Sequence, residues 1–152
     1  MEALVRRDLP MILVRVVVGL VFLLEGLFKF LLPEELGAGL FAAIGLPFAH
    51  LLAPAVGVVE ITGGAFILLN FYAGDAALTL LAVSITALGT TKLPILLHHA
   101  LGPFPLAQLP HYGWLGFFHE ARVDLLMLAC TLAIVIDSGV QVGRQRRWYQ
   151  SG

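Results

Sequence analysis

Ionisable side chains occur inside long apolar segments of this 152-residue chain. A charged group in the hydrocarbon core of a bilayer costs at least ~2.5 kcal/mol unless it is paired or hydrated. A bundle with no task beyond staying folded would do better with leucine at these positions, so the residues predict a site that binds a ligand or transfers protons. They are Glu25, Lys29, Glu60, Lys92, His119, Glu120, Arg122 and Asp124.

The spacing of these residues predicts how they interact. Glu25 and Lys29 are four apart with the acid first, the favourable order for an ion pair within a helix. Glu120 and Asp124 are also four apart, so their carboxylates share a helix face and need a cation between them. Close carboxylates are typical of sites that handle protons, and Glu60 and Glu120 are the candidate catalytic residues.

A purely structural role is the alternative interpretation of these charges. Buried ion pairs can fix the register of helices without taking part in any chemistry. Arg15 and Asp137 fall at a similar depth near the opposite side of the membrane, and we interpret them as a structural ion pair.

The histidines do not predict a metal site. His98, His99, His111 and His119 lie toward one side of the predicted bundle, but they form no HxxxH or HxxE pair on a helix. We therefore predict no metal centre.

The composition is that of a membrane protein. Hydrophobic residues make up 59% and charged residues 12% of the chain, whereas soluble domains have roughly 45–50% and about 25%. The net charge of −1 gives no basic surface for nucleic acid. A single cysteine excludes a disulfide framework.

Four apolar segments are each close to the ~20 residues that cross a bilayer. They predict one all-α membrane domain over residues 1–152, a four-helix bundle with spans at about 10–32, 51–72, 76–97 and 114–136. A tight turn at 72–75 makes the second and third spans antiparallel neighbours. The segment 34–50 can hold a short interfacial helix, whereas the prolines of 98–113 predict an ordered loop or a re-entrant cap.

The distribution of arginine predicts the orientation. Arginines outside the spans occur at positions 6, 7, 144, 146 and 147, whereas both long loops lack arginine and lysine. By the positive-inside rule both termini are cytoplasmic, in a multi-pass protein of the inner (plasma) membrane. All four spans then bring ionisable residues to one layer in the outer half of the bilayer. Glycines at positions 19, 26, 57, 63 and 64 allow the first two spans to pack closely.

Several short motifs resemble those of the DoxX family. Arg15-Val-Val-Val-Gly19-Leu-Val-Phe22-Leu-Leu-Glu25-Gly26-Leu-Phe-Lys29 resembles the first helix of that family, and Glu60-Ile-Thr-Gly63-Gly64 resembles an E-x-x-G-G motif of its second helix. Phe118-His119-Glu120 and Asp137-Ser-Gly139 are similar to its last helix. The resemblance implies a four-helix membrane bundle. Some members are linked to quinone-coupled oxidation, as in thiosulfate:quinone oxidoreductase, which implies that Glu25, Lys29, Glu60, Glu120 and Arg122 bind a quinone head group.

The first functional hypothesis is therefore a membrane subunit of a redox system with a polar pocket for a quinone or a similar small amphipathic molecule. The chain carries no intrinsic cofactor in this hypothesis, and as an enzyme it would be a quinone-linked oxidoreductase subunit that needs a redox partner. The alternative is non-enzymatic: a small transporter, which four helices would form as a homo-oligomer, or a membrane assembly or docking factor.

Overall fold

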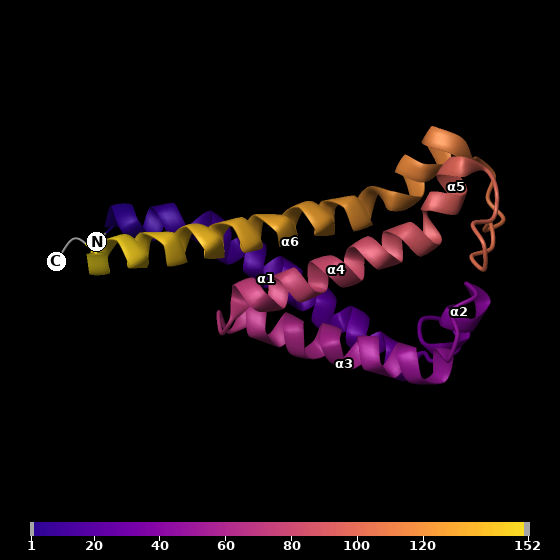
Figure 1. The fold of residues 1–152 in the computed structure, drawn as a ribbon, viewed down its shortest axis with the longest axis horizontal. Helices are drawn as coiled ribbons and strands as arrows, with labels where there is room; N and C mark the ends of the chain where they lie inside the picture. The colour runs from indigo at the N-terminus through magenta and orange to yellow at the C-terminus, as the bar shows by residue number, and fades with distance from the viewer. Residues whose placement is uncertain (1, 151–152) are drawn as a thin grey trace.

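Four long helices run in alternating directions and make up most of the molecule (Figure 1). The structure, a computed structural model, describes the backbone of residues 2–150 and the side chains of residues 9–139. The helices are α1 (Glu2–Leu31), α2 (Ala38–Ala43), α3 (Ala49–Leu68), α4 (Ala73–Thr91), α5 (Leu93–Leu97) and α6 (Gly113–Gln150). Within the described backbone no strand is formed, which confirms the prediction of an all-α fold.

Three segments of the described chain are long and apolar enough to cross a membrane: Leu9–Leu31, Ala49–Leu68 and Ala73–Leu97. They correspond to the first three predicted spans. The fourth predicted span lies in α6, whose first half contains Glu120, Arg122 and Asp124. These charges lower the apolar character of α6, and its crossing of the membrane stays a prediction.

The turn between α3 and α4 lies earlier in the chain than the predicted turn at 72–75. Helix α3 ends at Leu68, and Asn70 follows in the left-handed conformation with φ 53°. The amides of Asn70 and Phe71 donate back to the carbonyls of Ile67 and Phe66. The ring of Phe71 meets that of Phe66 edge to face at 5.5 Å, which completes a Schellman-type end to the helix.

Helices α1 and α6 extend beyond the membrane spans predicted within them. Helix α1 begins at Glu2 and continues through Pro10, although a proline inside a helix removes one backbone hydrogen bond. Helix α6 continues to Gln150, well past residue 136. The arginines that predict the orientation lie outside the residues whose side chains are described: Arg6, Arg7, Arg144, Arg146 and Arg147.

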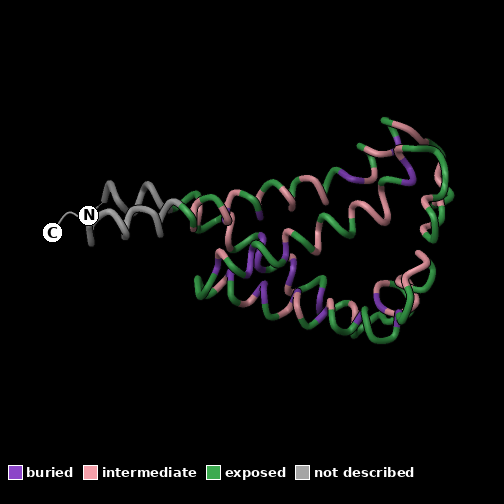
Figure 2. The backbone as a smooth tube through the Cα atoms, in the orientation of Figure 1, coloured by how far each residue is buried: buried purple, intermediate pink, exposed green. Residues whose placement is uncertain are grey.

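The four long helices form two arms that meet at one end and separate at the other. Helices α1 and α3 form one arm, and α4 and α6 form the second. A core of buried side chains joins the arms near the turn between α3 and α4, and Figure 2 shows these positions where α1, α3 and α4 converge. The core consists of Val18, Phe22, Ile67, Ala73, Ala76, Ala77, Leu80 and Ile134.

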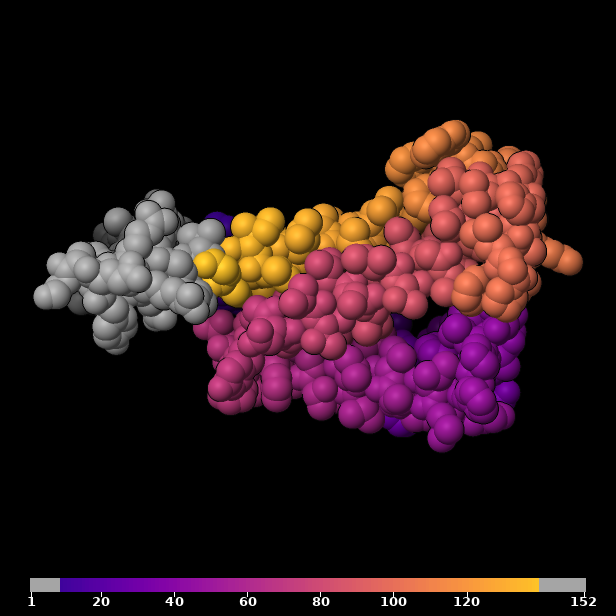
Figure 3. Space-filling view, viewed as in Figure 1, coloured from indigo at the N-terminus to yellow at the C-terminus, as the bar shows by residue number. Residues whose placement is uncertain are grey.

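An opening lies between the arms at the other end, which we call the loop end because α2 and residues 98–112 lie there. All the buried residues of α4 lie between Ala73 and Leu80, so its second half leaves the core. Figure 3 shows the surface hollowed between α3 and α4, next to α2. At the loop end itself the two connecting segments touch, because Gly45 packs against the backbone of Pro103 without room for a side chain.

Residues 98–112 form an ordered loop without a helix, as their prolines predict. The Tyr112 hydroxyl donates to the carbonyl oxygen of Ala107 at 3.0 Å and accepts from the amide of Leu109 at 3.1 Å. Its ring lies 4.7 Å from that of His98. These contacts fix the loop across the loop end of the α4–α6 arm.

Candidate functional site: two polar clusters beside the opening

Lys29 and Glu60 form a buried ion pair between α1 and α3. The Lys29 Nζ lies 2.6 Å from Glu60 Oε2, and the side chains are only 10% and 7% exposed. The two helices are antiparallel, and side chains lean toward the N-terminus of their own helix. Lys29 and Glu60 therefore lean toward each other along the shared axis, which lets the long lysine side chain close the distance.

This pairing corrects the predicted ion pair between Glu25 and Lys29. Lys29 Nζ donates to the backbone carbonyl oxygen of Glu25 at 3.5 Å, whereas its ion pair is with the carboxylate of Glu60. The side chain of Glu25 is exposed, and its negative charge lies near the Glu60 carboxyl group. We call Glu25, Lys29 and Glu60 the α1–α3 cluster.

Two glycine pairs bring α1 and α3 close enough for this contact. A Cβ atom on Gly64 would lie 2.6 Å from the Gly19 carbonyl oxygen, and one on Gly26 would lie 2.5 Å from that of Gly57. The glycines are seven residues apart on each helix, so one face of α1 meets one face of α3 along about two turns. The close packing predicted from these glycines is confirmed.

The remaining charges lie together on the other arm and form the α4–α6 cluster: Lys92, His119, Glu120, Arg122 and Asp124. Lys92 Nζ lies 3.7 Å from Asp124 Oδ2, with side chains 22% and 45% exposed. His119 Nδ1 lies 3.0 Å from Glu120 Oε1, and Arg122 donates to the backbone carbonyl of His119. Of the two carboxylates predicted to need a cation, Asp124 pairs with Lys92, whereas Glu120 contacts His119.

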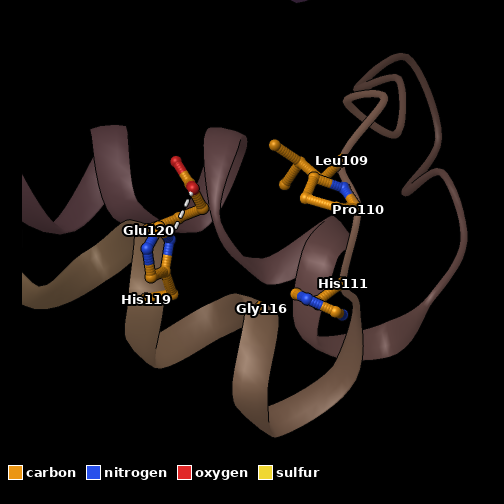
Figure 4. Close-up of a pocket in the computed structure, with 6 residues that line it drawn as sticks. All are labelled: Leu109, Pro110, His111, Gly116, His119 and Glu120. Carbon is orange, nitrogen blue, oxygen red and sulfur yellow. Dashed lines mark hydrogen bonds and ion pairs between the residues drawn. The ribbon is translucent and has the colours of Figure 1, made fainter.

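A small pocket adjoins this cluster at the loop end (Figure 4). Its volume is about 280 Å³. The loop supplies Leu109, Pro110 and His111, and the start of α6 supplies Gly116, His119 and Glu120. Gly116 lets the loop backbone at His111 lie directly against the first turns of α6.

The charged layer predicted from the sequence is thus divided between the two arms. Among the side chains of residues 9–139, the ion pairs of this layer join α1 to α3 and α4 to α6, and none crosses from one arm to the other. The opening lies between the two clusters. The ion pairs of this layer therefore do not form one closed network within the described side chains.

Arg15 and Asp137 form an ion pair at 2.9 Å, joining α1 to α6 near the turn between α3 and α4. Arg15 also donates to Asn70 Oδ1 at 2.7 Å. The contact with Asn70 was not predicted, although an asparagine directly after an apolar helical run is a recognisable signal for a left-handed residue at a helix end. One guanidinium thus connects α1, α6 and the turn.

The histidines are not gathered into a metal site in the described part of the chain. No group of three or more His, Cys, Asp or Glu side chains there is placed to hold a metal ion. His98 contacts Tyr112, His99 Nδ1 lies 2.8 Å from the Leu97 carbonyl oxygen, and His119 contacts Glu120.

Residues 11–99 match the family model described as DoxX, which is more than half of the chain. The chain belongs to the DoxX family. The matched DoxX segment runs from α1 through α5, so it contains the α1–α3 cluster, the glycine pairs and Lys92. The rest of the α4–α6 cluster lies beyond it, on α6.

The DoxX family protein described here is similar to a curated relative from Mycobacterium tuberculosis (strain ATCC 25618 / H37Rv), the uncharacterized membrane protein Rv3486. The two chains are 43% identical over 117 residues, which is 77% of this chain and 68% of the relative. No solved structure matches the chain at a significant level. Family, relative and apolar helices together identify a multi-pass membrane protein.

Proposed function

We propose that this DoxX family protein binds a quinone, or a small amphipathic molecule of similar shape, in the opening between its two arms. One observation carries the proposal: the ionisable residues fall into two clusters on separate arms, and a hollow lies between those arms (Figure 3), in a protein whose exposed helix faces are largely apolar. A polar space of this kind within an apolar bundle suits a molecule with a polar head group and an apolar tail.

The two clusters have different parts in this proposal. Lys29 and Glu60 are buried and paired, so they hold the α1–α3 wall in place beside the head group. Glu120 and Asp124 are partly exposed, and Glu120 lines the pocket under the loop, where a carboxyl group can exchange protons with a ligand and with water. The apolar tail would extend between the helices toward the lipid.

A redox role requires a second protein. Reduction of a quinone head group consumes two electrons and two protons. The proposal assigns the proton exchange to the carboxyl groups of this chain and the supply of electrons to a redox partner subunit. In the same proposal α6 is the fourth membrane span, and both termini are cytoplasmic.

Co-purification tests the binding step directly. The full chain is purified in mild detergent, extracted with organic solvent, and examined for quinone by absorbance and mass spectrometry. We expect a stoichiometric quinone in a folded sample. A folded sample that contains no quinone and does not bind an added short-tailed quinone would rule the proposal out.

Substitutions then locate the bound head group. Glu120→Gln removes a partly exposed carboxylate beside the pocket, and Glu35→Gln is the matched control because Glu35 is an exposed carboxylate between α1 and α2. We expect Glu120→Gln to weaken the binding of the reduced, short-tailed quinol about tenfold, because the charged carboxylate accepts a hydrogen bond from a quinol hydroxyl. The control should leave the affinity unchanged.

A further inference from the structure

Glu25 is an exposed carboxyl group within the membrane-spanning part of α1. In the described part of the chain, no side-chain hydrogen bond or ion pair is made to it, because Lys29 has its partner in Glu60. Such a residue is costly if it faces hydrocarbon. The direction in which Glu25 faces therefore decides its role.

The helical spacing of α1 answers this question. Glu25 follows Val14 by eleven residues and Val18 by seven, which are about three and two turns of helix. Val18 is fully buried in the core between the arms, and Val14 packs against that core. Glu25 therefore lies on the face of α1 that is turned toward α4 and α6, about 20° around the helix from Val18.

The lipid-facing side of α1 is a different one. Leu9, Val16, Leu20 and Leu27 are 38–52% exposed and lie on the opposite side of the helix from Val14 and Val18. Glu25 lies on the face of α1 that is buried at Val18, and the second half of α4 has no buried residues. We infer that the exposure of Glu25 results from the separation of the α4–α6 arm from α1 at this level. Its carboxyl group therefore borders the opening.

We propose that Glu25 is a hydrogen-bond acceptor in the opening and selects amphipathic ligands whose head group carries a donor, such as a hydroxyl. The inference rests on the proposed function, since it concerns a ligand in the same opening. An ionised carboxylate only accepts hydrogen bonds, so it favours a hydroxyl over a carbonyl group at the same position of the ligand. The other two residues of the α1–α3 cluster already satisfy each other, which leaves this selection to Glu25.

A short-tailed quinone and its reduced quinol are a suitable pair of probes, because they share a skeleton and differ in two hydroxyl groups. Binding of each is measured anaerobically at neutral pH to the full chain in nanodiscs, by quenching of tryptophan fluorescence. We expect the unmodified protein to bind the quinol about tenfold more tightly than the quinone, the effect of a hydrogen bond to a charged group.

Three variants test the assignment. Glu25→Gln can donate as well as accept, so the ratio of the two affinities should fall toward one, and Glu25→Asp should retain part of the preference. Glu35→Gln should leave the ratio unchanged. Circular dichroism and thermal unfolding confirm that each variant is folded.

The outcomes separate this inference from the proposed function. If both probes bind and Glu25→Gln has the same affinity ratio as the unmodified protein, the assignment of Glu25 is wrong while ligand binding stands. If neither probe binds to the folded protein, the proposed function and the inference both fail.

Discussion

Lys29 of α1 and Glu60 of α3 are joined by a 2.6 Å ion pair between helices that touch through glycine backbone. The pair lies within the segment that matches the DoxX family model. It is more buried than the Lys92–Asp124 pair on the other arm, although both connect neighbouring antiparallel helices. The two pairs therefore allow a direct comparison of a Lys–carboxylate ion pair at two different degrees of burial.

Removal of one partner from the buried pair should strongly destabilise the protein. Lys29→Met leaves the Glu60 carboxyl group buried without its cation, and we expect the free energy of unfolding to fall by about 3–5 kcal/mol. Lys92→Met is the matched control, and its loss should stay below about 1 kcal/mol because Asp124 is partly exposed. Thermal and denaturant unfolding in detergent measure both. Replacement of both partners by methionine should recover much of the loss. A double variant no more stable than Lys29→Met would contradict this account.

The glycine contacts between α1 and α3 predict a second, purely steric effect. Gly64→Ala places a Cβ atom 2.6 Å from the Gly19 carbonyl oxygen, so the helices must move apart, at an expected cost of about 1–3 kcal/mol. Gly89→Ala is the control, because a Cβ atom there meets nothing within 4 Å. The control should be neutral or slightly stabilising, since alanine favours a helix. Unfolding of the two variants under identical conditions provides the comparison, and equal stabilities would exclude the steric explanation.

Asn70 combines a backbone role and a side-chain role that two substitutions can separate. Asn70→Gly keeps the left-handed conformation and loses the hydrogen bond from Arg15, whereas Asn70→Ala loses both. We expect the alanine variant to be less stable than the glycine variant by about 1 kcal/mol. Thermal unfolding distinguishes them. If the two variants unfold at the same temperature, the left-handed residue does not limit the stability of this turn.

Cysteine labelling tests the orientation and the fourth span together. In a Cys130→Ala background, Gln108→Cys places a thiol on an exposed position of the loop, and Ser151→Cys places one near the C-terminus. If α6 crosses the membrane with both termini cytoplasmic, an impermeant maleimide added to whole cells should label position 108 and spare position 151. Labelling of both positions from outside would show that α6 does not cross as proposed.

The helices were predictable from sequence because they depend on long apolar runs, which dominate over local detail. The ends of helices were not, because they depend on single residues. Asn70 ends α3 earlier than the apolar run suggests, and α1 continues through Pro10 although proline disfavours the interior of a helix.

The membership of the candidate site stays a prediction, whereas the pairing of its charged residues can be compared with the structure. The sequence shows which residues are charged and how far apart they lie on one helix, and this favoured a pair between Glu25 and Lys29. The actual partner of Lys29 depends on the glycine contacts that bring α3 close to α1. The division of the charges between two arms depends on where α4 leaves the core, which no local spacing indicates.

The contact between Gly45 and Pro103 closes the loop end, while the hollow between α3 and α4 opens sideways (Figure 3). In the proposed function, a molecule in the opening would therefore exchange with the hydrophobic phase around the protein rather than with bulk water. Its concentration at the site is set by its mole fraction in the lipid, so measured affinities should change with the ratio of lipid to protein. A compound too polar to partition into the bilayer would not reach the opening, whatever its fit to the residues that border it.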